Sequence, residues 1–195
     1  MRRTTKAALG GLAGCALIFG TMQAANGAST ETYRYSGALR DLQLTTAGPF
    51  DSTRAKVTIV QDTDSTQFSI KITGIDISAS GKLLGSHLHT GPCFEGKGDV
   101  ALGHYNSQMA PAGTLTNYAE AVKSPSTEVW FDLVPSKEDG AASFKTTVPF
   151  VPKDLDGAMS IVVHVEPTQP ITGFASLRQA CFPMSVPQWI PKPTS

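Results

Sequence analysis

The sequence predicts an all-β fold, an eight-stranded antiparallel Greek-key β-barrel or sandwich with long loops. Charged residues make up only 16% of the 195 residues, which include 18 Gly and 13 Pro, and this composition favours turn-rich β structure over helices. Short alternating or apolar runs, divided by turn residues, recur along the chain, and helical periodicity is almost absent. The length is sufficient for one hydrophobic core, so we expect one domain with appendages.

Eight runs predict the strands. In the third run, Phe68, Ile70 and Ile72 occupy one face and polar residues occupy the other. Asp139-Gly140 lies between the fifth and sixth runs, where it predicts a tight hairpin turn. In chain order, the runs are Thr32–Leu39, Lys56–Gln61, Gln67–Ile72, Leu83–His89, Glu128–Val134, Ala142–Val148, Ser160–Val165 and Phe174–Phe182.

Two stretches do not fit a strand pattern. Residues 91–126 contain five glycines and three prolines, and a loop of that length in a compact domain is usually functional or held by cross-links. Residues 184–195 form a proline-rich C-terminal tail, which cannot enter the interior of a sheet because proline has no N–H to donate. Trp189 of this tail either packs the tail back on the body or contacts a partner.

Residues 1–27 have the pattern of a secretory signal peptide. Three basic residues make a positive start, residues 7–22 are apolar, and small residues follow. The apolar run is too short and too rich in glycine for a transmembrane helix. We expect cleavage before Ala28 and a protein that is secreted or periplasmic, in the cell envelope. In the alternative, residues 12–15 act as a lipobox and leave a lipid anchor on Cys15.

Removal of this leader leaves 13 basic and 16 acidic residues, a net charge of −3, because all three charged residues of the leader are basic. The chain has no basic run and no aromatic residues interleaved with basic ones, so nothing indicates a nucleic-acid partner. Two cysteines remain, Cys93 and Cys181. In an oxidising compartment they are most simply a disulfide, and the alternative is two unpaired buried thiols.

The chain has four histidines, and two of them flank Leu88. Alternate side chains of a strand point to the same face, so His87 and His89 are expected to stand side by side. His104 lies in the long loop and His164 near the end of a strand. A β-barrel can bring the four together, and four imidazoles without a thiolate or carboxylate suit copper, zinc or nickel. The alternative is that each is an ordinary surface or hydrogen-bonded core residue.

Four motifs occur in order across the strand pattern: GSHLHTGPC at 85–93, GHYN at 103–106, SIVVHVE at 160–166 and LRQAC at 177–181. Together they resemble the copper–zinc superoxide dismutases, in particular the bacterial secreted type. Each motif alone is weak, because H-x-H recurs by chance. The set is specific because it uses every histidine and both cysteines that remain after the leader. The resemblance covers about residues 33–182, so residues 28–183 are expected to form a dismutase-like domain.

The resemblance implies roles for individual residues. His87, His89 and His164 match copper ligands, and His104 matches the ligand that in the family bridges copper and zinc. Both cysteines match the disulfide that ties the ligand loop to the last strand. Arg178 matches the active-site arginine that draws the anionic substrate toward the metal. The implied site is therefore metal ligands His87, His89, His104 and His164, disulfide Cys93–Cys181, and catalytic residues Arg178 and His104.

The chain also departs from the family. No histidine lies between His104 and His164, where the family supplies two further histidines and an aspartate for zinc. We therefore expect one copper ion, no zinc, and a more open site, since the segment from His164 to Arg178 is shorter than the family's electrostatic loop. Without zinc, the far nitrogen of His104 needs another partner. Glu120, Glu128, a backbone carbonyl or a water could serve.

The expected function is that of a secreted copper-dependent superoxide dismutase, an enzyme that converts superoxide to oxygen and hydrogen peroxide. The alternative is a dismutase-like protein that sequesters or delivers copper with little or no turnover. A third reading is an adhesion or structural sandwich in which the histidines are incidental. Superoxide is the expected partner, with no nucleic acid and no transmembrane segment, and the sequence leaves open whether the chain forms a homodimer.

Overall fold

The computed structural model describes residues 30–44, 48–153, 159–184 and 188–189. The predicted leader and the alternative anchor at Cys15 lie outside these residues. The described chain forms β-strands and short 3-10 helices (η) in the following order: β1 (Glu31–Ala38), β2 (Arg40–Asp41), β3 (Arg54–Gln61), β4 (Thr66–Thr73), η1 (Ile77–Ala79), β5 (Ser86–His89), η2 (Gly98–Ala101), η3 (Tyr118–Glu120), β6 (Ala142–Val148), β7 (Ser160–His164), β8 (Arg178–Pro183) and β9 (Gln188–Trp189).

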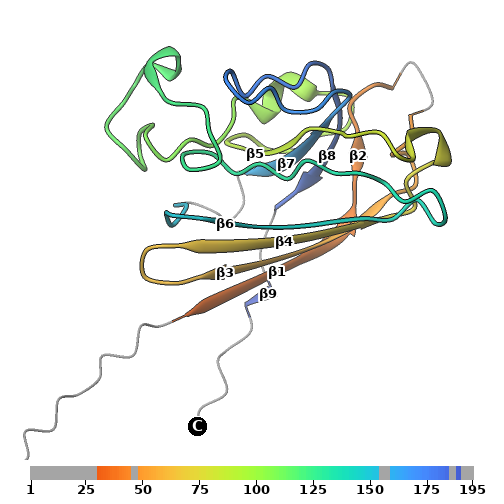
Figure 1. Ribbon diagram of the computed structural model, residues 1–195, viewed down its shortest axis with the longest axis horizontal. Coiled ribbons are helices and arrows are strands. Elements are labelled where there is room, and N and C mark those ends of the chain that lie inside the picture. The colour runs from red at the N-terminus through yellow and green to blue at the C-terminus, as the bar shows by residue number, and fades with distance from the viewer. Residues whose placement is uncertain (1–29, 45–47, 154–158, 185–187, 190–195) are drawn as a thin grey trace, which may run out of the picture.

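The strands form two antiparallel sheets. One has the order β6-β4-β3-β1-β9 and is the lower layer in Figure 1, and the other has the order β2-β8-β7-β5 and is the upper layer. The chain changes sheet on either side of β2, at each step from β4 to β7, and between β8 and β9. Greek-key folds have such connections between sheets. The all-β antiparallel prediction is confirmed. The sheets remain two layers of a sandwich rather than closing into a barrel, and the described residues contain nine strands instead of eight.

The core lies between the two layers. The alternating pattern of β3 and β4 directs Ile59 and Phe68 inward, while Leu88 of β5 and Ile161 of β7 point back from the other sheet, and all four are fully buried. Phe68 meets Phe131 edge to face, with ring centroids 5.7 Å apart. Each such side chain contributes roughly 1.5–3 kcal/mol through burial of apolar surface. The apolar side chains of β5 and β7 thereby fix which side of their sheet faces outward.

The fifth predicted strand, Glu128–Val134, is not a regular strand. It is an extended segment that lies along β5 through isolated bridges, Leu84↔Leu133 and His87↔Trp130. The N–H of Leu88 donates to the carbonyl of Val129 at 3.1 Å, and the N–H of Phe131 donates to Ser86 at 2.7 Å. The segment therefore extends the β5 sheet edge without forming a continuous ladder.

The predicted turn at Asp139-Gly140 is present. Gly140 has φ 61°, and a Cβ there would lie 2.0 Å from the carbonyl oxygen of Ile75, so only glycine fits. The turn does not close a hairpin, however, because β6 pairs with β4 in the other sheet. The turn instead carries the chain from one layer to the other.

The last predicted strand, Phe174–Phe182, begins later than expected, since β8 starts at Arg178. Phe174 and Leu177 lie in the preceding loop and are exposed. The disulfide Cys93–Cys181 is confirmed, with a Cα–Cα distance of 5.7 Å across 88 positions of sequence. It joins the loop after β5 to β8.

Two strands were not predicted, β2 and β9, and each is two residues long. β2 follows β1 almost directly and pairs with β8. β9 lies in the tail and pairs with β1 at the outer edge of its sheet, a position that the proline-rich tail can occupy. Part of the tail thus returns to the body. None of the helices in the described residues is long and apolar enough to cross a membrane.

Candidate metal centre

Two of the histidines stand on β5. Because Leu88 points into the core, His87 and His89 point to the outer side of the sheet, as the alternation predicts. Both are nonetheless fully buried, with exposures of 0%, because the long loops cover this side of the sheet. The shared face of the two rings is confirmed.

The other two histidines reach the same place from different elements. β7 pairs with β5, and His164 lies at its end, just past a register irregularity after Val163. His104 comes from the long loop, where an isolated bridge joins it to His89 and the N–H of Tyr105 donates to the carbonyl of Leu88 at 2.7 Å. Backbone pairing, not only side-chain packing, places both residues beside β5.

The four imidazoles form one compact cluster. Each offers one ring nitrogen, and these nitrogens all lie within 4.8 Å of one another. The ring centroids of the six pairs are 3.9 to 6.2 Å apart. The histidines that sequence reasoning grouped are therefore brought together, in an arrangement that could hold a metal ion.

Three nitrogens of the cluster lack a hydrogen-bond partner although they are buried: Nδ1 of His87, Nε2 of His89 and Nε2 of His164. A buried polar atom without a partner costs about 1–3 kcal/mol, so native proteins rarely leave several together. Lone pairs that converge in this way fit a metal ion, which replaces the missing hydrogen bonds with coordination.

Backbone carbonyls set the tautomers of two of the histidines. Nδ1 of His89 lies 3.1 Å from the carbonyl oxygen of Leu102, and Nδ1 of His164 lies 3.1 Å from that of Ser176. A carbonyl only accepts, so each Nδ1 carries the proton and donates it. The bare Nε2 of each ring then faces the cluster, as a metal ligand requires.

A hydroxyl and a carboxylate place the proton of His87 on Nε2, the opposite nitrogen from that in His89 and His164. Its Nε2 lies 2.8 Å from Oγ1 of Thr168, which donates its own hydrogen to Asp132 in a short hydrogen bond. Asp132 also accepts the backbone N–H of Thr168 at 3.1 Å. Because the hydroxyl has only one hydrogen, it must accept from Nε2 of His87. The bare nitrogen of His87 is therefore Nδ1, which faces the cluster.

His104 is held by Glu128. Its Nδ1 lies 2.9 Å from Oε2 of Glu128, which leaves Nε2 as the nitrogen available to a metal. Glu128 is 1% exposed and accepts three further hydrogen bonds, from Trp130, Tyr118 and Asn106, at 2.8, 2.6 and 3.1 Å. Among the partners considered from the sequence, Glu128 is thus the one observed.

Glu120, the other acidic candidate, is excluded as the partner of His104. It is exposed at the end of η3, and its Oε1 accepts a hydrogen bond from Asn117 at 3.0 Å. The difference is one of burial, because only Glu128 lies on the segment that runs along β5.

The electrostatics favour metal binding at neutral pH. Burial lowers the pKa of His87 and of His89, and it lowers the pKa of His164 to about 4, so these rings are neutral near pH 7. Burial alone would raise the pKa of Glu128, but the hydrogen bonds from His104, Tyr118 and Trp130 outweigh it and the pKa is lowered. An ionised Glu128 therefore lies against His104, beside the three neutral rings.

Arg178 borders the cluster at the start of β8, opposite His164 in the register. Its guanidinium donates to the carbonyl oxygens of Gly98 and Leu102 in short hydrogen bonds. Leu102 adopts φ 59°, a conformation that costs energy in a residue other than glycine, and its carbonyl also accepts from His89. The carbonyl of Leu102 thus accepts hydrogen bonds from both Arg178 and His89.

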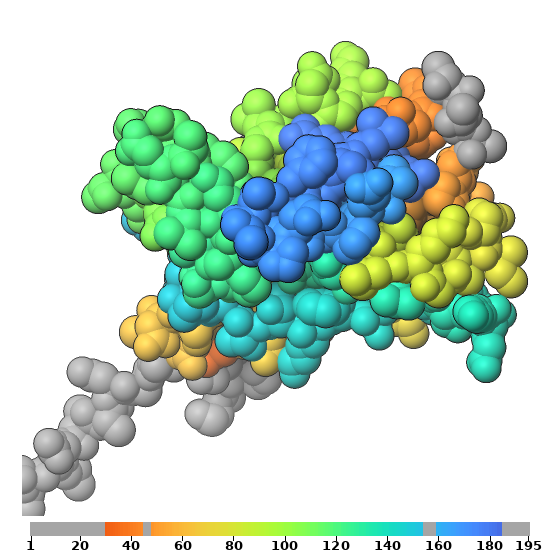
Figure 2. Space-filling view, turned by 45° about the horizontal axis from the view of Figure 1, so that its top comes forward, coloured from red at the N-terminus to blue at the C-terminus, as the bar shows by residue number. Residues whose placement is uncertain are grey.

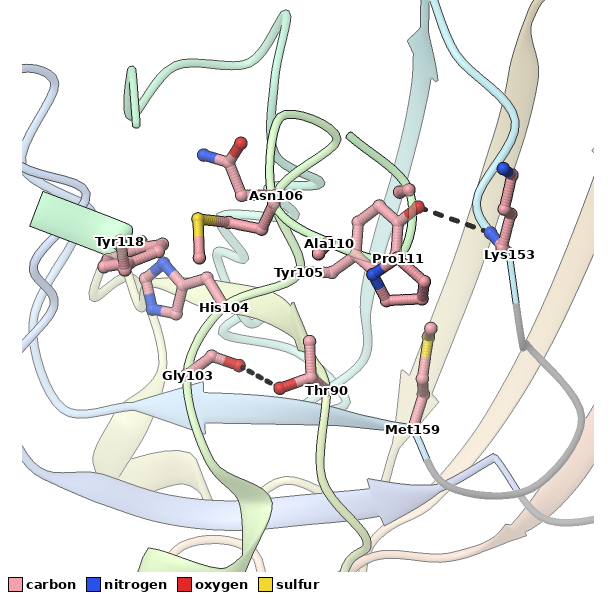
Figure 3. Close-up of a pocket in the computed structure, with 12 residues that line it drawn as sticks. Thr90, Gly103, His104, Tyr105, Asn106, Ala110, Pro111, Tyr118, Lys153 and Met159 are labelled. Atoms are coloured by element: carbon pink, nitrogen blue, oxygen red, sulfur yellow. Dashed lines mark hydrogen bonds between the residues drawn. The ribbon is translucent and has the colours of Figure 1, made fainter. Parts of the chain in front are cut away.

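Two hollows flank the cluster. One is lined by Gly98, Asp99, Leu102, Ser176, Leu177 and Arg178. The other, a cavity of about 410 Å³, lies on the far side of His104. Figure 3 shows His104 and Tyr118 at one end of this cavity and Lys153 and Met159 at the other. His104 is the one histidine in its lining, which also holds Met109 and Met159 and is mainly apolar.

Sequence reasoning missed Thr168, Asp132, Trp130 and Tyr118. For two of them a signal existed in the segment 128–133, where Val129, Phe131 and Leu133 are buried in the core. The alternate residues of an extended segment point to the other side, so Trp130 and Asp132 share a face with Glu128. That face lies beside the outward face of β5, where two of the histidines stand.

No protein-family model matches the chain, and no curated protein matches it.

Proposed function

We propose that this protein is a secreted copper-dependent superoxide dismutase that binds one copper ion and no zinc. The observation that carries the proposal is the set of converging bare nitrogens: Nδ1 of His87 and Nε2 of His89, His164 and His104. A site with four imidazoles and no thiolate suits copper, which changes between Cu(II) and Cu(I). The disulfide supports an oxidising compartment, since disulfides persist there.

When bound, copper supplies a one-electron couple, by which one superoxide is oxidised to oxygen and a second, with two protons, is reduced to hydrogen peroxide. The residues of the chain supply binding, attraction and proton handling. Nδ1 of His104 is engaged by Glu128, so it is not free for a second metal. His104 is also the most exposed residue of the four, with 13% of its side chain exposed, so its ring lies closer to solvent than the other three.

Arg178 supports the choice of an anionic substrate. It lines the hollow beside the cluster, and two carbonyls hold its guanidinium in place. A fixed positive charge at the edge of a partly buried site raises the local concentration of small anions and their rate of encounter. Its proximity also adds to burial in lowering the pKa of His164.

The test is to load the protein with copper and to follow superoxide decay directly at low and high salt. The wild type is expected to remove superoxide catalytically. Arg178→Ala is expected to lose about tenfold or more of the rate at low salt and much of the salt dependence. Arg40→Ala, which removes the same charge from an exposed position on β2, is the control. Equal rates for the two variants would refute the role of Arg178, and a copper-loaded wild type without turnover would refute the dismutase.

A second candidate function, copper transfer with little turnover, is favoured by apolar residues around the hollow. Leu102 and Leu177 line it with 56% exposure each, and Phe174 is 63% exposed in the same loop. Figure 2 shows this face, with the blue 165–184 segment between the green and lime loops. Exposed apolar groups in such a cluster often mark a contact with another protein. If copper transfer is the function, the copper-loaded protein removes little superoxide and gives its copper to an acceptor protein.

A further inference from the structure

The outer face of the five-stranded sheet is strongly cationic. It lies at the bottom of Figure 1 and points away from the sheet that carries His87, His89 and His164. On β1, β3, β4 and β6, every second residue points outward, and no outward position of these strands holds a carboxylate. The outward positions instead hold five exposed basic residues, Arg34, Arg54, Lys56, Lys71 and Lys145, which we call the basic face.

These charges are not balanced locally. Lys56 and Lys71 stand directly opposite each other on β3 and β4, a like-charge pairing that destabilises a sheet. The described residues contain one ion pair within 4.0 Å, His104–Glu128. No member of the basic face therefore forms an ion pair with a carboxylate of the described residues. The whole chain has 16 basic and 16 acidic residues, so the basic face reflects segregation of charge and not a basic composition.

An acidic residue, Asp139, lies near the basic face without forming an ion pair with it. Asp139 is in the exposed turn before β6, and its carboxylate accepts the N–H of Ala141 at 3.0 Å. That hydrogen bond is the main cause that lowers its pKa, and the charge of Lys71 is the smallest. Lys71 makes no ion pair within 4.0 Å with a carboxylate of the described residues.

The middle of the basic face is a shallow hollow that combines charges with hydroxyl groups. It is lined by Lys56, Lys71 and Lys145 together with Thr58, Ser69 and Ser143. The cations continue across four adjacent strands from Arg34 on β1 to Lys145 on β6, a span of about 14 Å at the usual strand spacing. Such a row matches an extended chain that carries repeated negative charges and hydroxyls.

We propose that the basic face binds an acidic polysaccharide, one whose sugar units carry carboxylate or sulfate groups. Charge complementarity supplies the attraction, and the threonine and serine hydroxyls offer hydrogen bonds to sugar hydroxyls. An anionic membrane fits less well, because none of the exposed large apolar side chains of the described residues lies on these four strands. Single-stranded nucleic acid also fits less well, because the face has no exposed aromatic ring for base stacking. The proposal does not depend on the metal or on dismutation.

The test compares two triple variants that remove the same charge. Lys56→Gln/Lys71→Gln/Lys145→Gln changes the basic face, and Lys82→Gln/Lys97→Gln/Lys137→Gln changes three exposed lysines elsewhere. Binding of each full-length protein to dextran sulfate, polygalacturonate, neutral dextran and anionic lipid vesicles is measured across a salt series. Thermal unfolding checks the fold, and the face variant is expected to be at least as stable as the wild type because the Lys56–Lys71 repulsion is removed.

The wild type and the control variant are expected to bind at least one of the two acidic polymers, weakly at high salt, and not neutral dextran. The face variant is expected to bind with an affinity lower by a factor of about ten or more. Its salt dependence is expected to be shallower, because fewer counterions are released. Three results would overturn the proposal: no binding of the wild type to either acidic polymer at low salt, equal loss in both triple variants, or binding to vesicles alone.

Discussion

The hydroxyl of Thr168 determines which nitrogen of His87 faces the other histidines. It donates to Asp132 and therefore accepts from Nε2 of His87, which leaves Nδ1 bare. The other rings present Nε2, so one histidine of the cluster is reversed relative to the rest. Three hydrogen bonds cause the reversal: Nε2 of His87 to the Thr168 hydroxyl, and the hydroxyl and the N–H of Thr168 to Asp132. The hydroxyl has one hydrogen, which it gives to Asp132.

Asp132→Asn is expected to move the imidazole proton of His87. The backbone N–H of Thr168 keeps an acceptor by taking the amide oxygen, so the amide NH₂ faces the hydroxyl. The hydroxyl then donates to Nε2 of His87, and the proton occupies Nδ1, where it opposes metal binding. We expect about 10- to 100-fold weaker copper binding, and nitrogen NMR of the metal-free protein should report the Nδ1–H tautomer of His87.

Thr168→Ser, which keeps the hydroxyl, serves as the matched control and should retain both the tautomer and the affinity. An unchanged His87 tautomer in Asp132→Asn would mean that the hydroxyl and carboxylate do not set the orientation of this ligand. The NMR readout separates this role from a purely structural one, which would alter stability without moving the proton.

At the scale of elements, the segment that carries Glu128 connects the long loop to β5. One carboxylate collects hydrogen bonds from Tyr118 and Asn106 of the loop and from His104. Gly173 of the opposite loop packs against the same group, since a Cβ there would lie 3.3 Å from Oε2 of Glu128. Several loops without regular structure are thus held by one buried charge.

Glu128→Gln is expected to weaken copper binding by about 10- to 100-fold, because His104 loses its charged partner. Stability should fall by about 1–3 kcal/mol, because an amide cannot accept all four hydrogen bonds. Glu120→Gln is the control, with a change within about 0.5 kcal/mol, as for most exposed positions. Copper titration and chemical unfolding measure both effects. Equal behaviour of the two variants would contradict the assignment of Glu128.

The strands differ in how well the sequence predicts them, for physical reasons. β3 and β4 bury one face and alternate over eight residues each, so periodicity alone predicts them. β2 and β9 have two residues each, too few for any period to appear. The apolar residues Phe174 and Leu177 suggested an earlier start for β8, but they are exposed beside the hollow instead of entering the sheet.

At the scale of the whole molecule, the convergence of the histidines needs contacts that local pattern cannot supply. Alternation predicts that His87 and His89 share a face, and this is confirmed. The approach of His104 depends on a loop that pairs its backbone with β5, which no period in the loop sequence indicates. The resemblance of the four motifs to a known family supplied that expectation. Alternation could have placed Asp132 on the face of Glu128, but the hydrogen bond that joins Thr168 to it lay beyond both kinds of reasoning.

The stability of the metal-free protein is expected to depend on pH through the cluster. The pKa of His164 falls to about 4 on folding, and those of His87 and His89 fall as well, from an ordinary value of 6.5. The unfolded chain therefore binds more protons below pH 6.5, and stability decreases as the pH falls from there toward 4. Thermal unfolding of the metal-free protein across this range should show a falling Tm. A constant Tm between about pH 7 and pH 5 would contradict the burial of neutral rings.

We expect four histidines from three parts of the chain to hold one copper ion. Anomalous diffraction at the copper absorption edge, from crystals of the copper-loaded protein, locates the ion. One copper peak is expected in the cluster, bonded to Nδ1 of His87 and to Nε2 of His89, His104 and His164. A peak elsewhere, or one that lacks contact with His104 or His164, would contradict this expectation.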